Sequence, residues 1–93
     1  MFTNQELVQI TSFVLSNVRT YKFVNFSNSY ICYHIDDYRI NVFKITSLGK
    51  FKYYKITLHY DNIELKRALV YDMNILKKYF EGFISYIKHN CNI

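Results

Sequence analysis

The sequence has no proline, no tryptophan, two glycines and two cysteines in 93 residues. With so little glycine there is no glycine-rich loop to cradle a phosphate group, and no P-loop, dinucleotide-binding fingerprint or HExxH motif occurs. Two cysteines are too few for a disulfide framework. No run of about 18 apolar residues is present, so no transmembrane helix is expected. These absences argue against several classes of enzyme, against a disulfide-rich secreted domain and against a membrane-spanning protein.

Residue types with G/C-rich codons are also scarce, whereas Phe, Tyr, Ile, Asn and Lys are abundant. This bias predicts an AT-rich genome, such as that of a virus, a bacteriophage or a mobile element. It also weakens any argument from basicity, since lysine is then frequent for codon reasons. The N-terminus lacks the basic segment and cleavage site of a secretory signal, so a cytoplasmic location is expected, in the host cell if the protein is viral.

The residues that are present suit one compact domain over positions 1–93. Hydrophobic residues make up 51% of the chain and aromatic residues 19%, which is ample apolar surface for a core. A single core of this size gives a stability margin of only about 5 kcal/mol. Oligomerisation is therefore a reasonable expectation, and a homodimer formed through a sheet edge or a tyrosine-rich face would be one form of it.

Helix signals stand at both ends of the sequence. Thr3 and Glu6 have the spacing of a capping box, and the apolar residues that follow recur at helical spacing, which predicts a helix over residues 4–18. Asp72 is a favourable N-cap for a second helix. The apolar face of this helix consists of Leu76, Phe80, Phe83, Ile84 and Ile87. Gly82 is unfavourable inside a helix and predicts a close approach to the sheet.

Between the helices the apolar pattern changes to period two, with β-branched and aromatic residues dominant. Strands are predicted over residues 21–27, 30–35, 38–46, 51–60 and 63–71. Turn residues separate the strands, and Gly49 can adopt a positive φ at one turn. The sequence therefore predicts an α+β fold: an N-terminal helix, a four- or five-stranded antiparallel meander and a C-terminal helix, with both helices on one face of the sheet.

The last hairpin has an alternative interpretation. If residues 61–62 form its loop, Leu58 faces Leu65 and apolar residues lie opposite one another. A change of apolar phase at residues 42–43 predicts a β-bulge. Residues 61–90 can alternatively be read as one long helix. The hairpin is preferred, because three apolar residues would fall on the wrong face of such a helix.

The segment "SYICYHIDDYRI" carries the densest group of reactive side chains. Cys32 and His34 share one face of a strand, and with His89 and Cys91 they would make a two-Cys, two-His set for zinc. Their spacings are not those of common zinc sites, so no metal is expected. Cys32 as a nucleophile would need an oxyanion hole that this glycine-poor chain does not offer, and adjacent aspartates at 36–37 are ordinary turn residues. No catalytic residue, cofactor or enzymatic activity is predicted.

Binding is the remaining function class. A sheet with helices on one face leaves its other face for a partner, and tyrosine is a residue type that binding surfaces use. Lysines interleaved with aromatics in "KFKYYK" are also typical of nucleic-acid-binding surfaces. The candidate partner-binding residues are Tyr30, Tyr38, Tyr53, Tyr54, Lys50, Lys52 and Lys55.

The sequence favours a small, non-catalytic accessory protein that binds a host or partner protein and modulates it, most plausibly as an inhibitor. The alternative is a basic nucleic-acid-binding module that uses a lysine- and tyrosine-rich sheet face.

Overall fold

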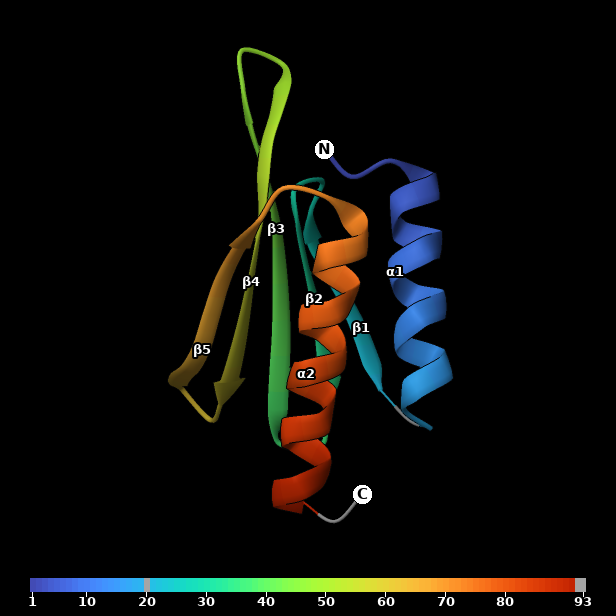
Figure 1. Ribbon diagram of the computed structural model, residues 1–93, viewed down its shortest axis with the longest axis vertical. Helices are drawn as coiled ribbons and strands as arrows, with labels where there is room; N and C mark the ends of the chain where they lie inside the picture. Colours follow the sequence, from blue (N-terminus) through green and yellow to red (C-terminus); the bar gives the residue numbers. More distant parts are fainter. Residues whose placement is uncertain (20, 92–93) are drawn as a thin grey trace.

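A computed structural model of the chain describes residues 1–19 and 21–91, apart from the side chains of Asn25, Phe26 and Cys91. The elements in chain order are α1 (Asn4–Asn17), β1 (Lys22–Ser27), β2 (Tyr30–Ile35), β3 (Tyr38–Ser47), β4 (Lys50–Tyr60), β5 (Ile63–Val70) and α2 (Met73–Cys91). The strands form one antiparallel sheet in the order β1-β2-β3-β4-β5, and both helices lie on the same face of it (Figure 1). The predicted α+β fold is confirmed.

Both helices begin where the capping residues predict. The Glu6 amide donates to Thr3 Oγ1 at 3.1 Å, while the Thr3 amide donates to Glu6 Oε1 at 2.8 Å, which completes the capping box of α1. At the start of α2, Asp72 Oδ1 accepts a hydrogen bond from the amide of Ile75 at 3.0 Å. The alternative of one helix over residues 61–90 is wrong, because Ile63–Val70 forms β5.

The core lies between the helices and the sheet. The predicted apolar face of α2 is buried throughout, and Phe80 meets the fully buried ring of Tyr33 edge to face at 5.8 Å between centroids. The Tyr33 hydroxyl is 2.9 Å from Thr11 Oγ1 on α1, so β2 is tied to both helices. Burial raises the pKa of Tyr33 to about 12, which keeps this hydroxyl protonated at neutral pH.

Two details of the predicted strand pairing are wrong. The bulge between β3 and β4 lies at Ile45/Thr46 rather than at residues 42–43. A second irregularity in β5 shifts the last hairpin, so that Leu58 faces Lys66 instead of Leu65. The shift has a physical reason, because it places Val70 opposite Tyr54, where its side chain is buried in the core.

The predicted close approach at Gly82 is also wrong, and this changes what a substitution there should do. A Cβ added at Gly82 would meet no atom within 4 Å. Gly82→Ala is therefore expected to stabilise the protein by about 0.5–1 kcal/mol, because alanine is the better helix former and restricts the unfolded chain. Urea denaturation followed by circular dichroism measures the change.

Gly49→Ala is the matched control for this substitution. Gly49 has φ +77°, a conformation that costs an L-residue about 1–2 kcal/mol, so the same chemical change should destabilise the protein there. A loss of stability in Gly82→Ala would show that α2 needs the glycine after all.

Candidate binding surface

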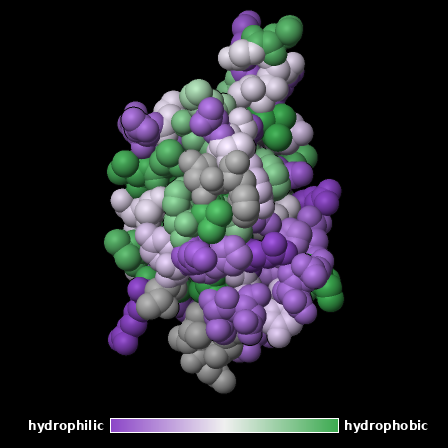
Figure 2. Space-filling view, turned by 180° about the vertical axis from the view of Figure 1, so that it is seen from behind, coloured by the Kyte–Doolittle hydropathy of each residue, from purple (hydrophilic) through white to green (hydrophobic). Residues whose placement is uncertain are grey.

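The face of the sheet opposite the helices, called the open face from here on, presents side chains in cross-strand rows. The row nearest the turns at residues 36–37 and 61–62 consists of His34, Arg39, His59 and Glu64. The middle row consists of Cys32, Asn41, Thr57 and Arg67. The third row consists of Tyr30, Phe43, Lys55 and Leu69. Figure 2 shows the molecule from this side, with hydrophilic side chains gathered over its lower half.

The middle of the open face holds a chain of side-chain hydrogen bonds. The Tyr30 hydroxyl donates to Asn41 Oδ1 at 2.9 Å, Asn41 Nδ2 donates to Thr57 Oγ1 at 3.4 Å, and His59 Nε2 lies 3.2 Å from the same hydroxyl. Asn41 and Thr57 are buried although no helix covers them, since Tyr30 and His59 reach over them. A satisfied polar network of this kind fixes side-chain positions and gives the open face a rigid centre.

Permanent positive charge surrounds this centre. Arg39 lies between the imidazoles of His34 and His59 in the cross-strand row, and Lys55 Nζ stands 4.4 Å from the centroid of the Phe43 ring. Burial lowers the pKa of His34 and of His59, and the charge of Arg39 lowers both further. Both imidazoles are therefore neutral at pH 7, and the cationic character of the face comes from lysine and arginine.

A two-stranded arm projects beyond the sheet. The last pairs with the neighbouring strands are Tyr30 with Phe43 and Val70 with Tyr54, and residues 45–53 extend past them as a hairpin, called the hairpin arm from here on (Figure 1). At its tip Leu48 and Gly49 have φ of 54° and 77°. Positive φ at both residues of a two-residue loop is the mark of a type I′ turn, which suits the twist of the strands.

The hairpin formed by β3 and β4 carries the net charge of the protein. Residues 38–60 contain five cations and no acid, and the formal net charge of the whole chain is +5. These cations are Arg39, Lys44, Lys50, Lys52 and Lys55. The remaining lysines and arginines are matched in number by the acidic residues, so the rest of the chain is neutral overall. Lys50 and Lys52 are exposed on the arm.

A partly buried carboxylate fixes the base of the arm. Glu6 at the start of α1 receives Lys44 Nζ of β3 at 2.6 Å and a short hydrogen bond from the Tyr54 hydroxyl of β4. Burial raises the pKa of Glu6, but the hydrogen bonds from Lys44, the Thr3 amide and Tyr54 outweigh it and hold the pKa below its ordinary value of 4.5. Glu6 is therefore ionised at neutral pH and links α1 to both strands of the arm.

The structure divides the predicted binding residues into two groups. Tyr30, Tyr53 and Lys55 lie half-buried on the open face, and Lys50 and Lys52 are exposed on the arm. Tyr38 and Tyr54 were expected in the same set, but they lie on the helix-covered face with exposures of 7% and 6%.

Strand periodicity explains this correction. Tyr38 is paired with Ile35, and Tyr54 precedes Ile56 by two residues, so both share the buried side. Tyr38 and Tyr54 are therefore removed from the candidate surface.

The reactive residues of the opening hairpin are not assembled into a site. Cys32 and His34 lie on the open face of β2, whereas His89 lies on α2 across the sheet and the side chain of Cys91 is outside the described part. Among the residues described, no three His, Cys, Asp or Glu side chains are placed to hold a metal ion. Burial raises the pKa of the Cys32 thiol, which disfavours the thiolate that a nucleophile requires.

Asp36 and Asp37 are both exposed in the β2–β3 turn, and Asp36 has a positive φ of 56°. Aspartate tolerates that conformation better than most residues, so the pair has a structural reason to be there.

Several important residues escaped sequence reasoning. Asn41 and Thr57 sit at alternating strand positions that normally point to solvent, and their burial depends on pairing between β3 and β4. The only sequence signal was asparagine inside a strand, where it is disfavoured. Arg39 was not considered as a binding residue, although its position two residues from Asn41 places it on the same face.

Comparison with protein-family models, curated proteins and solved structures finds no match to this chain. None of the helices in the described residues is long and apolar enough to cross a membrane.

Proposed function

We propose that this chain is a non-catalytic nucleic-acid-binding protein whose contact surface is the hairpin arm together with the open face. The observation that carries the proposal is the segregation of charge: the β3–β4 hairpin holds five cations and no acid, while the rest of the chain is neutral overall. A polyanion that meets the molecule is drawn to this hairpin, whose projecting arm carries the exposed Lys50 and Lys52 and whose open face carries Arg39 and Lys55.

The shape and chemistry of the arm support this choice of polyanion. A two-stranded β-ribbon fits the major groove of DNA, which is about 12 Å wide. Exposed lysines contact phosphate groups without regard to base sequence. Phe51 lies between Lys50 and Lys52 in the sequence and Tyr53 follows Lys52, and both residues offer rings on which unpaired bases can stack. Arg39 is the one arginine in the β3–β4 hairpin, so recognition of the backbone is expected rather than of base edges.

The test is fluorescence anisotropy with labelled duplex DNA, single-stranded DNA and RNA over a range of salt concentrations. Affinity should fall steeply with salt, because binding releases counterions from the phosphates. In the Lys50→Gln, Lys52→Gln double variant the slope of log K against log salt should fall by about 2, one for each lost phosphate contact.

A Lys78→Gln, Lys88→Gln double variant is the matched control. It removes the same charge from exposed positions on α2, away from the arm, and should keep most of the affinity. No binding of any of the three probes at low salt would remove the proposal, and an equal loss in both double variants would show that only net charge matters.

A protein partner is the second candidate, and the tip of the arm favours it. Leu48 is 99% exposed and Phe51 42%, and an apolar side chain at a projecting tip contributes nothing to phosphate contacts. An acidic protein surface with an apolar pocket would use the lysines and Leu48 together. The expectation that such a partner is a host protein, inhibited by this chain, is supported by codon bias and small size alone.

Leu48→Asn separates the two candidates, since asparagine tolerates the positive φ at this position. Nucleic-acid affinity should change by less than about twofold, because the phosphate contacts are intact. For a protein partner, losing a buried leucine should cost about tenfold or more.

A further inference from the structure

The outer edge of β5 carries exposed apolar side chains as well as charged ones. Within residues 1–19 and 21–91, the strand order β1-β2-β3-β4-β5 places no neighbour beyond β5, and Figure 1 shows no helix across this edge. Ile63 is 62% exposed, Leu69 49% and Leu65 38%. An unpaired strand edge with exposed apolar residues is a template for a further strand, and natural proteins generally cover or charge such edges.

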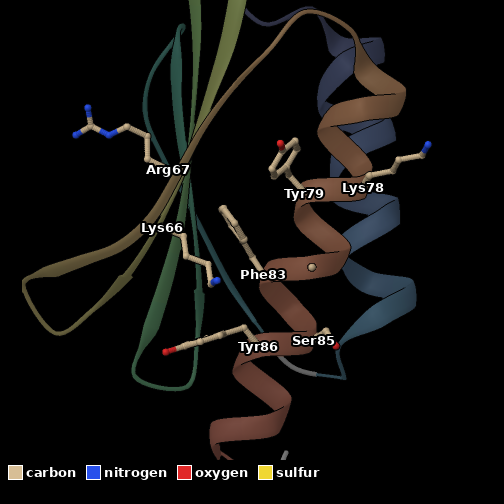
Figure 3. Close-up of a pocket in the computed structure, with 8 residues that line it drawn as sticks. Lys66, Arg67, Lys78, Tyr79, Phe83, Ser85 and Tyr86 are labelled. Carbon is tan, nitrogen blue, oxygen red and sulfur yellow. The ribbon is translucent and has the colours of Figure 1, made fainter.

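A groove runs beside this edge on the helix side. Lys66 from β5 and Tyr79, Phe83 and Tyr86 from α2 point into the gap between the two elements, as Figure 3 shows, while Arg67 points away on the other side of the strand. Lys66 Nζ lies 5.0 Å from the centroid of the Tyr86 ring. The groove continues the apolar surface of the edge and would also be covered by a strand added to β5.

The charge order along β5 indicates which strand fits. On the open face Arg67 holds Glu64 through two hydrogen bonds of 3.0 and 3.1 Å, and both side chains stand at the free edge. When two identical strands pair antiparallel about a two-fold axis, the acid of each copy can lie opposite the base of the other copy. An acid and a base three positions apart in the strand then form two equivalent contacts between the copies. The sequence of β5 is self-complementary in this sense.

The irregularity in β5 restricts the register of such a pairing. Because the chain shifts at Leu65, Ile63, Lys66 and Ala68 lie on the helix side, and Glu64 and Arg67 on the open face. A two-fold axis between Leu65 and Lys66 keeps the pairs on either side of the shift on a common face: Ile63 meets Ala68 of the second copy on the helix side. Glu64 meets Arg67 of the second copy on the open face. Among the registers that place paired side chains on the same face of the sheet, this register pairs the largest number of β5 residues.

We propose that β5 is a homodimer interface, at which two copies of this chain pair antiparallel through Glu64 and Arg67 to form one continuous ten-stranded sheet. The two-fold axis is perpendicular to the sheet, so both open faces lie on the same side. The apolar edge and the groove of each copy are covered by the other. The inference does not depend on the proposed nucleic-acid binding, and either can fail without the other.

Two charge reversals test this pairing when they are mixed. Glu64→Arg alone and Arg67→Glu alone each place like charges opposite one another at both contacts, and each should weaken dimerisation about tenfold or more. In an equimolar mixture the two variants restore both intermolecular contacts, whereas the pair within each chain stays broken. Mixing should therefore give 1:1 heterodimers.

Sedimentation velocity and native mass spectrometry under reducing conditions measure the outcome, with circular dichroism to show that both variants fold. The expected result is a dimeric wild type, monomeric single variants and a heterodimeric mixture. A wild type that stays monomeric at about 100 μM would overturn the proposal and leave the edge to a strand from another protein. Single variants that dimerise as well as the wild type, or a mixture that stays monomeric, would overturn it equally.

Discussion

Phe80→Ala is expected to remove about 4 kcal/mol from the free energy of unfolding. Phe80 is fully buried at the middle of α2, and its ring packs edge to face against Tyr33. The cavity left by the ring has little chance to close, because Tyr33 is held in place by its hydrogen bond to Thr11. A single core of this size gives only about 5 kcal/mol of stability in total, so about 1 kcal/mol would remain and a detectable fraction of this variant should be unfolded at room temperature.

Tyr79→Ala is the control, one residue away in the same helix. Tyr79 is 42% exposed in the single chain, so a change of about 1 kcal/mol or less is expected when both variants are measured at a concentration too low for pairing through β5. Urea denaturation followed by circular dichroism gives both values. Similar losses in the two variants would mean that α2 does not pack on the sheet through Phe80.

The fold was predictable because local signals and apolar periodicity agree along most of this chain. The Thr3–Glu6 capping box, the Asp72 cap and the turn at Gly49 each depend on residues close in sequence, and each forms as predicted. The one predicted bulge was misplaced and the irregularity in β5 was not predicted, because a bulge depends on what lies opposite. The shift in β5 follows from Val70 entering the core beside Tyr54, a contact that no local pattern encodes.

The candidate surface was predictable only in part, for a related reason. Tyr30 and Lys55 could be placed on the open face by alternation, but Tyr38 and Tyr54 could not be separated from them without knowing which face the helices cover. The net charge and its confinement to residues 38–60 can be read from the sequence, while the projection of this hairpin beyond the neighbouring strands needs the strand pairing. Charge distribution in space is therefore what the structure adds to the functional argument.

Glu6→Gln is expected to cost about 2 kcal/mol at pH 7, since it removes the charge from a partly buried carboxylate that accepts several hydrogen bonds. Glu6 and Lys44 are only 15% and 12% exposed, so solvent screens their interaction weakly. The variant leaves the Lys44 ammonium without its counter-ion and weakens the bond from Tyr54. Urea denaturation at several pH values gives the free energy of unfolding of both proteins.

The pH dependence of the free energy of unfolding distinguishes the effect of the Glu6 charge from the effect of its packing. Its folded-state pKa lies below the unfolded value, so its contribution is fully present above pH 4.5 and is lost as the pH falls through the folded-state pKa. The wild type should therefore lose stability in acid, whereas Glu6→Gln should lose less. The difference between them should be constant from pH 7 down to about 5.5 and shrink toward zero below the folded-state pKa.

Glu81→Gln provides the control, because Glu81 is an exposed acid on α2 and its removal should change stability by about 0.5 kcal/mol or less. A Glu6→Gln deficit that stays the same in acid would assign the effect to altered packing rather than to the ion pair. If the ion pair carries it, the consequence reaches the binding surface. Glu6 holds β3 through Lys44 and β4 through Tyr54 at the base of the hairpin arm, so loss of its charge loosens the segment that carries the exposed Lys50 and Lys52.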